Sequence, residues 1–167
     1  HVGRTVACRN GAFGGRRHTD EAVTHSVNGA NQSWMIGVVT QRPGADPQAT
    51  GRENLLLAGR IHGMRGAAVK ARVAELLDRF GLFEAANRTV RTYSGGMQRK
   101  LDVAMGLVHR PRVLFLDEPT TGLDPQARAD VWTEISRLAA QEGLTVLLTT
   151  HYLDEADQLA DMLAIVD

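Results

Sequence analysis

Two adjacent carboxylates, those of Asp117 and Glu118, directly follow a short apolar run at residues 113–116. Side chains of neighbouring residues at a strand end point to different sides, so these two groups suit different tasks. One can bind Mg²⁺, which takes few protein oxygens beside those of phosphate and water. The other can orient or deprotonate an attacking water molecule. The alternative is a simple acidic turn, which the following Pro119 also favours.

The segment Ser94-Gly95-Gly96 precedes a helical pattern and has the composition of a phosphate site. Glycines expose backbone N–H groups, and the N-terminus of a helix carries about half a positive charge. The Ser94 hydroxyl can donate a hydrogen bond to the same phosphate. The alternative is that Ser94 only caps the helix that follows.

Three further polar residues occupy positions where functional groups are common. Gln41 follows an apolar run at residues 36–40, and His151 follows another at 145–149, where it could donate to a terminal phosphate. Asp124 precedes Pro125, a pair that ordinarily begins a helix. Taken singly, each of the three is also consistent with an ordinary polar residue at the end of an element.

The elements that must position these residues alternate along the chain. Apolar runs predict buried strands at residues 36–40, 113–116, 145–149 and 163–166. Helical patterns cover residues 52–61, 69–80, 97–108, 125–139 and 153–160. Such alternation is typical of a parallel sheet with helices on both faces, in which polar residues at the carboxyl ends of the strands meet. The first 33 residues lack any such period and contain several glycines, so we expect loops there.

Composition narrows the class of protein. The 167 residues are 43% hydrophobic, enough to bury the core of one domain. No apolar run is long enough to span a membrane and no secretory signal is visible. The single cysteine, Cys8, excludes a disulfide framework. A formal net charge of zero argues against a polybasic protein that binds nucleic acid.

Four motifs in this order resemble those of the ATP-binding cassette (ABC) ATPases. They are Tyr-Ser-Gly-Gly-Met-Gln-Arg at 93–99, Leu-Phe-Leu-Asp-Glu-Pro-Thr at 114–120, Thr-Gly-Leu-Asp-Pro at 121–125 and Thr-His at 150–151. The resemblance covers about residues 34–167. It implies an α/β, P-loop NTPase-like layered fold with a mainly parallel sheet, an inserted helical subdomain and an incomplete N-terminal part. With His-Tyr-Leu-Asp-Glu-Ala-Asp at 151–157, the motifs look like the branch that exports drugs and antibiotics such as daunorubicin.

The resemblance also implies a role for the glycine-containing segment. Ser94, Gly95 and Gly96 would form the signature motif, which binds the γ-phosphate of ATP held by the opposite subunit. Met97 occupies the fifth position of that motif, where the family usually has Gln. Gln98 follows it and would contribute to cofactor binding.

Roles are likewise implied for the residues at the strand ends. Asp117 would be the Walker B aspartate, which holds Mg²⁺ directly or through water, and Glu118 would be the catalytic carboxylate. Gln41 would be the Q-loop glutamine, which touches Mg²⁺ and couples to the membrane partner. Asp124 would be the D-loop residue that contributes to the ATP site, and His151 would be the switch histidine.

The phosphate cradle of this family, G-x-x-x-x-G-K-[ST], is missing. Lys70 and Lys100 are the only lysines, and neither follows a glycine. The segment at residues 10–16, Asn-Gly-Ala-Phe-Gly-Gly-Arg, resembles the cradle only faintly, and a planar Arg is no substitute for the compact Lys ammonium. Since losing these contacts removes about 5 kcal/mol of binding free energy, we expect that the chain as given does not hydrolyse ATP alone.

The motifs divide the chain into segments. We expect residues 34–51 to hold a strand and the Q-loop, 52–93 the helical subdomain, and 94–167 the signature, Walker B, D-loop and H-loop. Residues 1–33 are left unassigned, and the simplest hypothesis is that they are foreign or mis-framed and that the domain is cut short at Asp167. True degeneration of the cradle is the alternative.

Two functions follow from these expectations. The first is the ATP-hydrolysing subunit of an ABC exporter, which forms a homodimer or heterodimer on an integral-membrane permease, at the cytoplasmic face of the cell membrane. The second is a degenerate half that offers only its signature face to the ATP of another subunit. The resemblance implies ATP and Mg²⁺ as cofactors and no nucleic acid as a partner. The exported substrate cannot be read, because the permease selects it.

Overall fold

The computed structural model describes residues 4–10, 36–150 and 162–166. Their strands are β1 (Arg4–Asn10), β2 (Ile36–Val39), β3 (Val113–Asp117), β4 (Thr145–Thr150) and β5 (Met162–Val166). Their α-helices are α1 (Gly51–Ile61), α2 (Gly66–Arg79), α3 (Gly95–Leu107) and α4 (Pro125–Glu142), with a short 3₁₀ helix at Val90–Thr92. The predicted strands and helices within these residues are confirmed, with ends shifted by only a few residues. The helix predicted at 153–160 lies outside the described residues.

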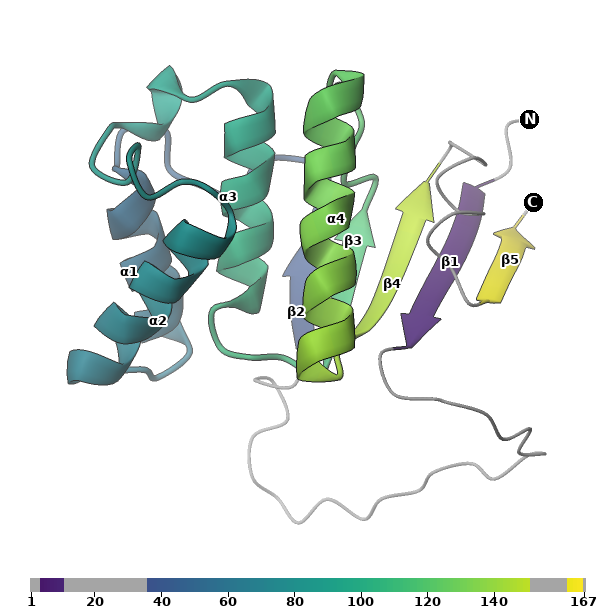
Figure 1. Cartoon of the computed structure of the whole chain (residues 1–167), viewed down its shortest axis with the longest axis horizontal. Coiled ribbons are helices and arrows are strands. Elements are labelled where there is room, and N and C mark those ends of the chain that lie inside the picture. The colour runs from purple at the N-terminus through teal and green to yellow at the C-terminus, as the bar shows by residue number, and fades with distance from the viewer. Residues whose placement is uncertain (1–3, 11–35, 151–161, 167) are drawn as a thin grey trace, which may run out of the picture.

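The strands form one sheet in the order β2-β3-β4-β1-β5 (Figure 1). Strands β2, β3 and β4 are parallel, whereas β1 is antiparallel to both β4 and β5. All strands except β1 therefore point the same way. This arrangement confirms the α/β class and the mainly parallel sheet.

The prediction of loops throughout the first 33 residues is wrong at β1. This strand lies between β4 and β5 and pairs with both, from Thr5 beside Thr150 to Cys8 beside Met162. Its sequence, Arg-Thr-Val-Ala-Cys-Arg-Asn, has no clear period-2 pattern. Since both edges of its backbone find hydrogen-bond partners from distant segments, the tertiary pairing decides the strand.

Helices α3 and α4 lie across one face of the sheet (Figure 1). Helix α3 and strand β2 lie in close contact at Gly37. A Cβ at this position would lie 2.3 Å from the Gly106 carbonyl oxygen, so only glycine fits there. The side chains that β3 and β4 direct toward these helices, including Leu114, Leu116 and Val146, are buried. A single helical layer therefore builds the core beneath the sheet.

The opposite face of the sheet differs from the expectation of two buried faces. Among the described residues, Val38 is 61% exposed, Ile36 45% and Phe115 41%. A hollow of about 340 Å³ lies on the sheet beside Val38 and Phe115. The apolar runs therefore predicted the strands correctly, but the described residues cover only one face of them.

Helices α1 and α4 begin where the sequence provides side-chain caps. The Thr50 hydroxyl accepts from the Glu53 N–H at the start of α1, and the Glu53 carboxylate accepts from the Thr50 N–H, which is a complete capping box. The Asp124 carboxylate caps α4, and Gly143 ends it at φ 63°. The apolar stripe of α2, centred on Val73 and Leu76, is fully buried, and α2 packs against α1.

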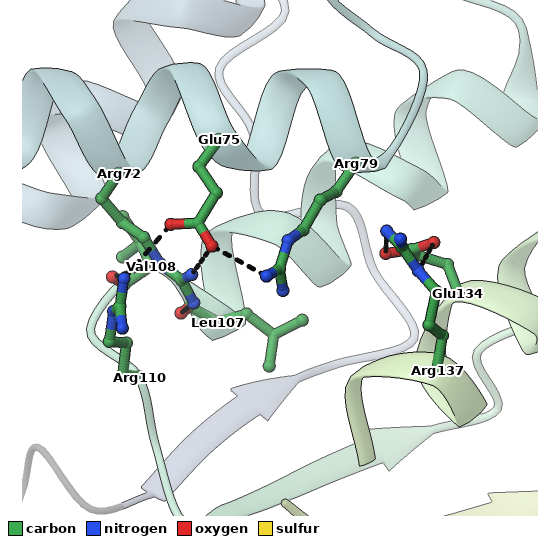
Figure 2. A network of polar contacts seen from close by, with 8 residues as sticks. All are labelled: Arg72, Glu75, Arg79, Leu107, Val108, Arg110, Glu134 and Arg137. Carbon is green, nitrogen blue, oxygen red and sulfur yellow. Dashed lines mark hydrogen bonds and ion pairs between the residues drawn. The ribbon is translucent and has the colours of Figure 1, made fainter. Parts of the chain in front are cut away.

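A polar network fastens α2 to the end of α3 (Figure 2). The buried Arg72 guanidinium donates to the carbonyl oxygens of Leu107, at 2.8 Å, and Val108, at 3.3 Å. It thereby provides a donor for the Val108 carbonyl at the end of α3 and a second donor for the Leu107 carbonyl, which also accepts from the Arg110 N–H. Glu75 forms ion pairs with Arg72, Arg79 and Arg110. This network holds α2 against the C-terminal end of α3.

Candidate functional site

The carboxyl ends of β2 and β3 bring Gln41 and Glu118 together. The Gln41 side-chain amide donates to Glu118 Oε2 at 2.7 Å across a separation of 77 residues. The two strands are parallel neighbours, and Val39 lies opposite Leu116, so the residues that follow them meet. The expectation that these polar residues converge is confirmed by this hydrogen bond.

Glu118 sits in an unusual backbone conformation. Its φ is +45°, in the left-handed region that non-glycine residues seldom adopt. The residue is only 7% exposed, and its carboxylate also accepts from the Thr121 hydroxyl at 3.3 Å. Its N–H donates to the Thr149 carbonyl oxygen at 3.1 Å. Contacts on the backbone and on the side chain therefore hold Glu118 in place. A backbone strained by a positive φ is characteristic of functional sites.

Asp117 ends β3 directly opposite Thr149 of β4. The Thr149 hydroxyl donates to Asp117 Oδ1 at 2.6 Å, and the same hydroxyl accepts from the Glu118 N–H at 3.2 Å. We call Gln41, Asp117, Glu118 and Thr149 the strand-end cluster. Within it, Asp117 Oδ2 has no hydrogen-bond partner among the described residues and remains available to a further ligand.

The strand-end cluster fits Mg²⁺ only in the company of a nucleotide. In the part of the chain that the structure describes, no group of three or more His, Cys, Asp or Glu side chains could hold a metal ion. Asp117 and the Gln41 side-chain oxygen nevertheless offer hard oxygen donors at one strand edge. Since Mg²⁺ keeps several waters and binds through one or two carboxylates plus phosphate, this small donor set suits it.

Arg99, on α3, joins the cluster to the rest of the site. Its guanidinium donates to the carbonyl oxygens of Pro119 at 2.6 Å, Thr40 at 2.7 Å and Asp117 at 3.0 Å. These carbonyls belong to the residues that directly flank Gln41 and Glu118 in the sequence. Burial lowers the pKa of Arg99, and Asp102 and Asp117 act in the opposite direction.

Sequence reasoning missed both Arg99 and its neighbour Asp102. The Asp102 carboxylate accepts from the N–H groups of Gly44, at 3.0 Å, and Ala45, at 3.2 Å, and so anchors the loop after Gln41. Burial raises the pKa of Asp102. The available signal was two charged residues on the buried face of a helical pattern, where unpaired charges are rarely found.

We call Ser94, Gly95 and Gly96 the signature segment, and it lies at the N-terminus of α3. The Ser94 hydroxyl accepts from the Met97 N–H at 3.3 Å, which confirms that it caps the helix. Gln98 is directed back to the preceding turn, where its amide donates to the Tyr93 carbonyl oxygen at 3.3 Å.

The two glycines of the segment have different surroundings. A Cβ at Gly96 would lie 2.8 Å from the Ala127 side chain, so Gly96 permits the close contact of α3 with α4. A Cβ at Gly95 would make only an ordinary contact with Leu123, at 3.9 Å, and Gly95 is exposed to solvent. Gly95 is therefore the position that a phosphate can approach.

The remaining predicted site residues are placed less fully. Asp124 accepts from the Ala127 N–H at 2.9 Å and caps α4 beside the signature segment. Among the described residues, no hydrogen bond joins Ser94, Gly95 or Gly96 to the strand-end cluster. His151 lies outside the described residues. The same is true of most of residues 10–16, the segment that faintly resembles a phosphate cradle.

With this geometry established, comparisons with known proteins identify the class. The sequence model of the ABC transporter family matches residues 14–121. The chain therefore belongs to the ABC transporter family. The match begins before Trp34, the residue at which the strand and helix pattern starts.

The chain is similar to several curated members of that family. Three of them each align over 132 residues, or 79% of this chain. The daunorubicin resistance ATP-binding protein DrrA3 of Streptomyces coeruleorubidus is 53% identical, and the alignment covers 42% of its length. The daunorubicin/doxorubicin resistance ATP-binding protein DrrA of Streptomyces peucetius is 54% identical over 40% of its length. The Nod factor export ATP-binding protein I of Ralstonia nicotianae is 46% identical over 41% of its length. The chain thus spans about two fifths of the relatives that it matches.

In the stretches of chain that the structure describes, none of the helices has both the length and the apolar character needed to cross a membrane.

Proposed function

We propose that this chain carries the catalytic carboxylates and the signature motif of an ATP-binding subunit that drives an ABC-type exporter of drugs or antibiotics. The observation that supports this proposal best is the strand-end cluster, where Gln41 contacts Glu118 and Asp117 lies beside them. Relatives named for daunorubicin and doxorubicin resistance support the class of exporter.

The chemistry at the cluster follows from its donor atoms. Mg²⁺, when bound with ATP, neutralises the charge on the phosphates. Asp117 and Gln41 would hold the metal through oxygen atoms that the internal hydrogen bonds leave available. Glu118 orients the attacking water molecule and accepts its proton. His151 donates a hydrogen bond to the terminal phosphate, which is the role of a switch histidine.

The signature segment serves the ATP of the opposite subunit. A hydroxyl has one proton and two lone pairs, so Ser94 can accept from the Met97 N–H and still donate its proton to a phosphate. The exposed backbone at Gly95 and the positive end of α3 add to the attraction. Gln98 contributes to the cofactor site from the same turn, and Asp124 lies at the contact between the two subunits.

The partners follow from the same reading. Two ATP-binding subunits, identical or different, form the working dimer, and residues 52–93 dock on an integral-membrane permease. The exposed apolar side chains of Leu57, Ile61 and Phe83 in that region suit such a contact. The subunit is then held at the cytoplasmic face of the membrane through the permease, and nucleic acid plays no part.

A second candidate function is favoured by the missing cradle. The sequence contains no G-x-x-x-x-G-K-[ST] segment. The hollow on the sheet is lined mainly by apolar side chains, such as Val38, Phe115 and Leu147, and no cation for phosphate is among the described residues that line it. The chain would then be a degenerate half that lends its signature segment to the ATP of a cradle-bearing subunit.

Two substitutions, tested in this chain together with a cradle-bearing homologue, distinguish these functions. The chain is purified alone and together with a cradle-bearing homologue, and ATP binding and hydrolysis are measured. We expect the chain alone to bind ATP no tighter than about millimolar. In the pair, Ser94→Arg in this chain abolishes the ATPase under both functions, because it blocks the phosphate of the partner's ATP.

Glu118→Gln, made in the natural protein and tested in the paired subunits, then separates the two functions. If the chain is a degenerate half, the ATPase of the pair is unchanged, since no ATP occupies the site beside Glu118. In a complete protein that includes a cradle, the same substitution keeps ATP binding and nearly abolishes turnover. Unchanged turnover in the complete protein would remove Glu118 from the catalytic role.

A further inference from the structure

The Thr149 hydroxyl contacts both acidic residues of the strand-end cluster, Asp117 and Glu118. Thr149 is the β4 residue paired with Asp117 of β3 in the parallel register. Its hydroxyl is 2.6 Å from Asp117 Oδ1 and 3.2 Å from the Glu118 nitrogen. Its carbonyl oxygen is 3.1 Å from the same nitrogen. One residue thus contacts the side chain of Asp117 and the backbone of Glu118.

The directions of these hydrogen bonds are fixed by the number of protons. The Glu118 N–H can only donate, and the threonine hydroxyl has a single proton. The hydroxyl therefore accepts from Glu118 and gives its one proton to Asp117 Oδ1. Hydrogen bonds to a carboxylate are shorter and stronger than neutral ones, in agreement with the 2.6 Å separation.

This arrangement has a consequence for Asp117. With Oδ1 held by Thr149, the carboxylate cannot rotate freely, and Oδ2 is the oxygen without a hydrogen-bond partner among the described residues. A ligand held in one orientation before the metal arrives loses less conformational freedom on binding. Outer-shell hydrogen bonds of this kind raise metal affinity.

Glu118 depends on Thr149 in a different way. Gln41 and Thr121 both donate to Glu118 Oε2, so its carboxylate has anchors that do not involve Thr149. Thr149 instead holds the Glu118 N–H, at the residue whose φ of +45° costs free energy. Removal of the hydroxyl should therefore affect the metal-binding aspartate more than the water-binding carboxylate.

We propose that Thr149 is a positioning residue for the metal-binding carboxylate of the ATP site. This inference rests on the proposed function, in which Asp117 holds Mg²⁺. Thr149 touches neither substrate nor reacting atoms. It acts by fixing the orientation of the Asp117 carboxylate and by restraining the backbone of Glu118.

The test uses two substitutions that separate the hydroxyl from the shape of the side chain. Thr149→Val keeps the branched shape and suits a strand, whereas Thr149→Ser keeps the hydroxyl. In the complete protein with ATP present, Mn²⁺ is titrated as a paramagnetic probe of the Mg²⁺ site, and ATP affinity is measured separately in EDTA.

We expect Thr149→Val to weaken Mn²⁺ binding about tenfold, with ATP affinity in EDTA unchanged. Thr149→Ser should restore Mn²⁺ affinity to within about twofold of the wild type, since the hydroxyl provides the effect. Wild-type Mn²⁺ affinity in Thr149→Val, or equal losses in both variants, would overturn the proposal. An absence of ATP-dependent Mn²⁺ binding in the wild-type protein would instead contradict the proposed function.

A second measurement needs no nucleotide and uses this chain directly. Amide hydrogen exchange is followed in peptides that cover residues 113–121, with a peptide from α2 as the reference. Thr149→Val should increase exchange at the Glu118 N–H several-fold, because one of its two acceptors is lost. Thr149→Ser should not. Unchanged exchange in Thr149→Val would contradict the role of Thr149 at Glu118, even if the ATP site proved to be incomplete.

Discussion

The strand-end cluster and the signature segment are built in opposite ways. Gln41, Asp117 and Glu118 are held by interlocking hydrogen bonds from three elements. The signature segment has one cap hydrogen bond, at 3.3 Å, and an exposed glycine backbone at Gly95.

Under the proposed function, this difference matches what each region would bind. A metal and a water molecule require donors in fixed positions before the reaction, since preorganised groups need no rearrangement in the transition state. A phosphate carried by another subunit requires open N–H groups that nothing on its own chain has already occupied. Under that proposal, the order of one region and the accessibility of the other suit two different ligands.

The largest expected effect removes the anchor of the ordered region. Arg99→Met keeps the length of the side chain but leaves three carbonyl oxygens without their donor. Charge-assisted hydrogen bonds contribute about 1.5–3 kcal/mol each, and we expect the free energy of unfolding to fall by about 3–5 kcal/mol. Urea denaturation measures this change.

Arg137→Met provides the matched control for that substitution. Arg137 is on the surface of α4 and pairs only with Glu134 among the described residues, so its loss should cost about 0.5 kcal/mol or less. Similar losses for Arg99→Met and Arg137→Met would show that the cluster is not held by α3.

A smaller effect tests whether the signature segment is uniformly open. Gly96→Ala places a methyl group 2.8 Å from Ala127 and should cost about 1–3 kcal/mol of stability, because two packed helices must move apart. Gly95→Ala meets nothing closer than 3.9 Å and should change stability by less than about 0.5 kcal/mol. Thermal unfolding of the two variants compares them directly, and equal stabilities would contradict the distinction between the two glycines.

Ser94 allows the cap to be separated from the phosphate contact. Ser94→Ala should lower stability by about 1 kcal/mol, because the Met97 N–H loses its acceptor. Ser94→Asp keeps an acceptor and should retain the stability of the wild type, yet a carboxylate repels phosphate. Urea denaturation and the ATPase rate of the paired subunits report the two properties. A Ser94→Asp variant with full ATPase activity would leave Ser94 as a cap only.

The smallest expected effect lies outside both regions, at His109. Burial lowers the pKa of His109 below 6.5, with a further contribution from the stacked ring of His62 at 3.8 Å. Its Nε2 lies 3.1 Å from the Ile36 carbonyl oxygen, and its buried Nδ1 has no partner among the described residues. A proton added at Nδ1 would therefore lack an acceptor.

The sign of the pH dependence follows from this lowered pKa. The unfolded chain takes up a proton near pH 6.5, whereas the folded chain does so only at lower pH. Stability is therefore retained above pH 6.5 and lost as the pH falls toward the folded pKa. Urea denaturation at pH 7.5 and 5.5 should show a loss in the wild type that is smaller in His109→Gln. Equal losses of stability in the two proteins would exclude His109 as the source of the pH dependence. The carboxylates of the strand-end cluster would then be tested next.

Local patterns were sufficient for much of the fold. The stripe of α2, the caps at Ser94 and Asp124, and the strands β2 to β4 follow from the spacing of apolar residues and from capping chemistry. Because parallel strands bring their carboxyl ends together, the meeting of Gln41 with Glu118 was also predictable.

Other features depend on contacts between distant segments. Strand β1 has no clear pattern of its own and exists because β4 and β5 pair with it. The roles of Arg99 and Thr149 depend on the fold. It places the carbonyl oxygens of Thr40 and Pro119 around the Arg99 guanidinium. It also places the Asp117 carboxylate beside the Thr149 hydroxyl. The sequence by itself determined which residues could do the chemistry, since that depends on residue type and local spacing. Only the tertiary structure decided which groups hold them in place, because that depends on atoms brought together from separate strands and helices.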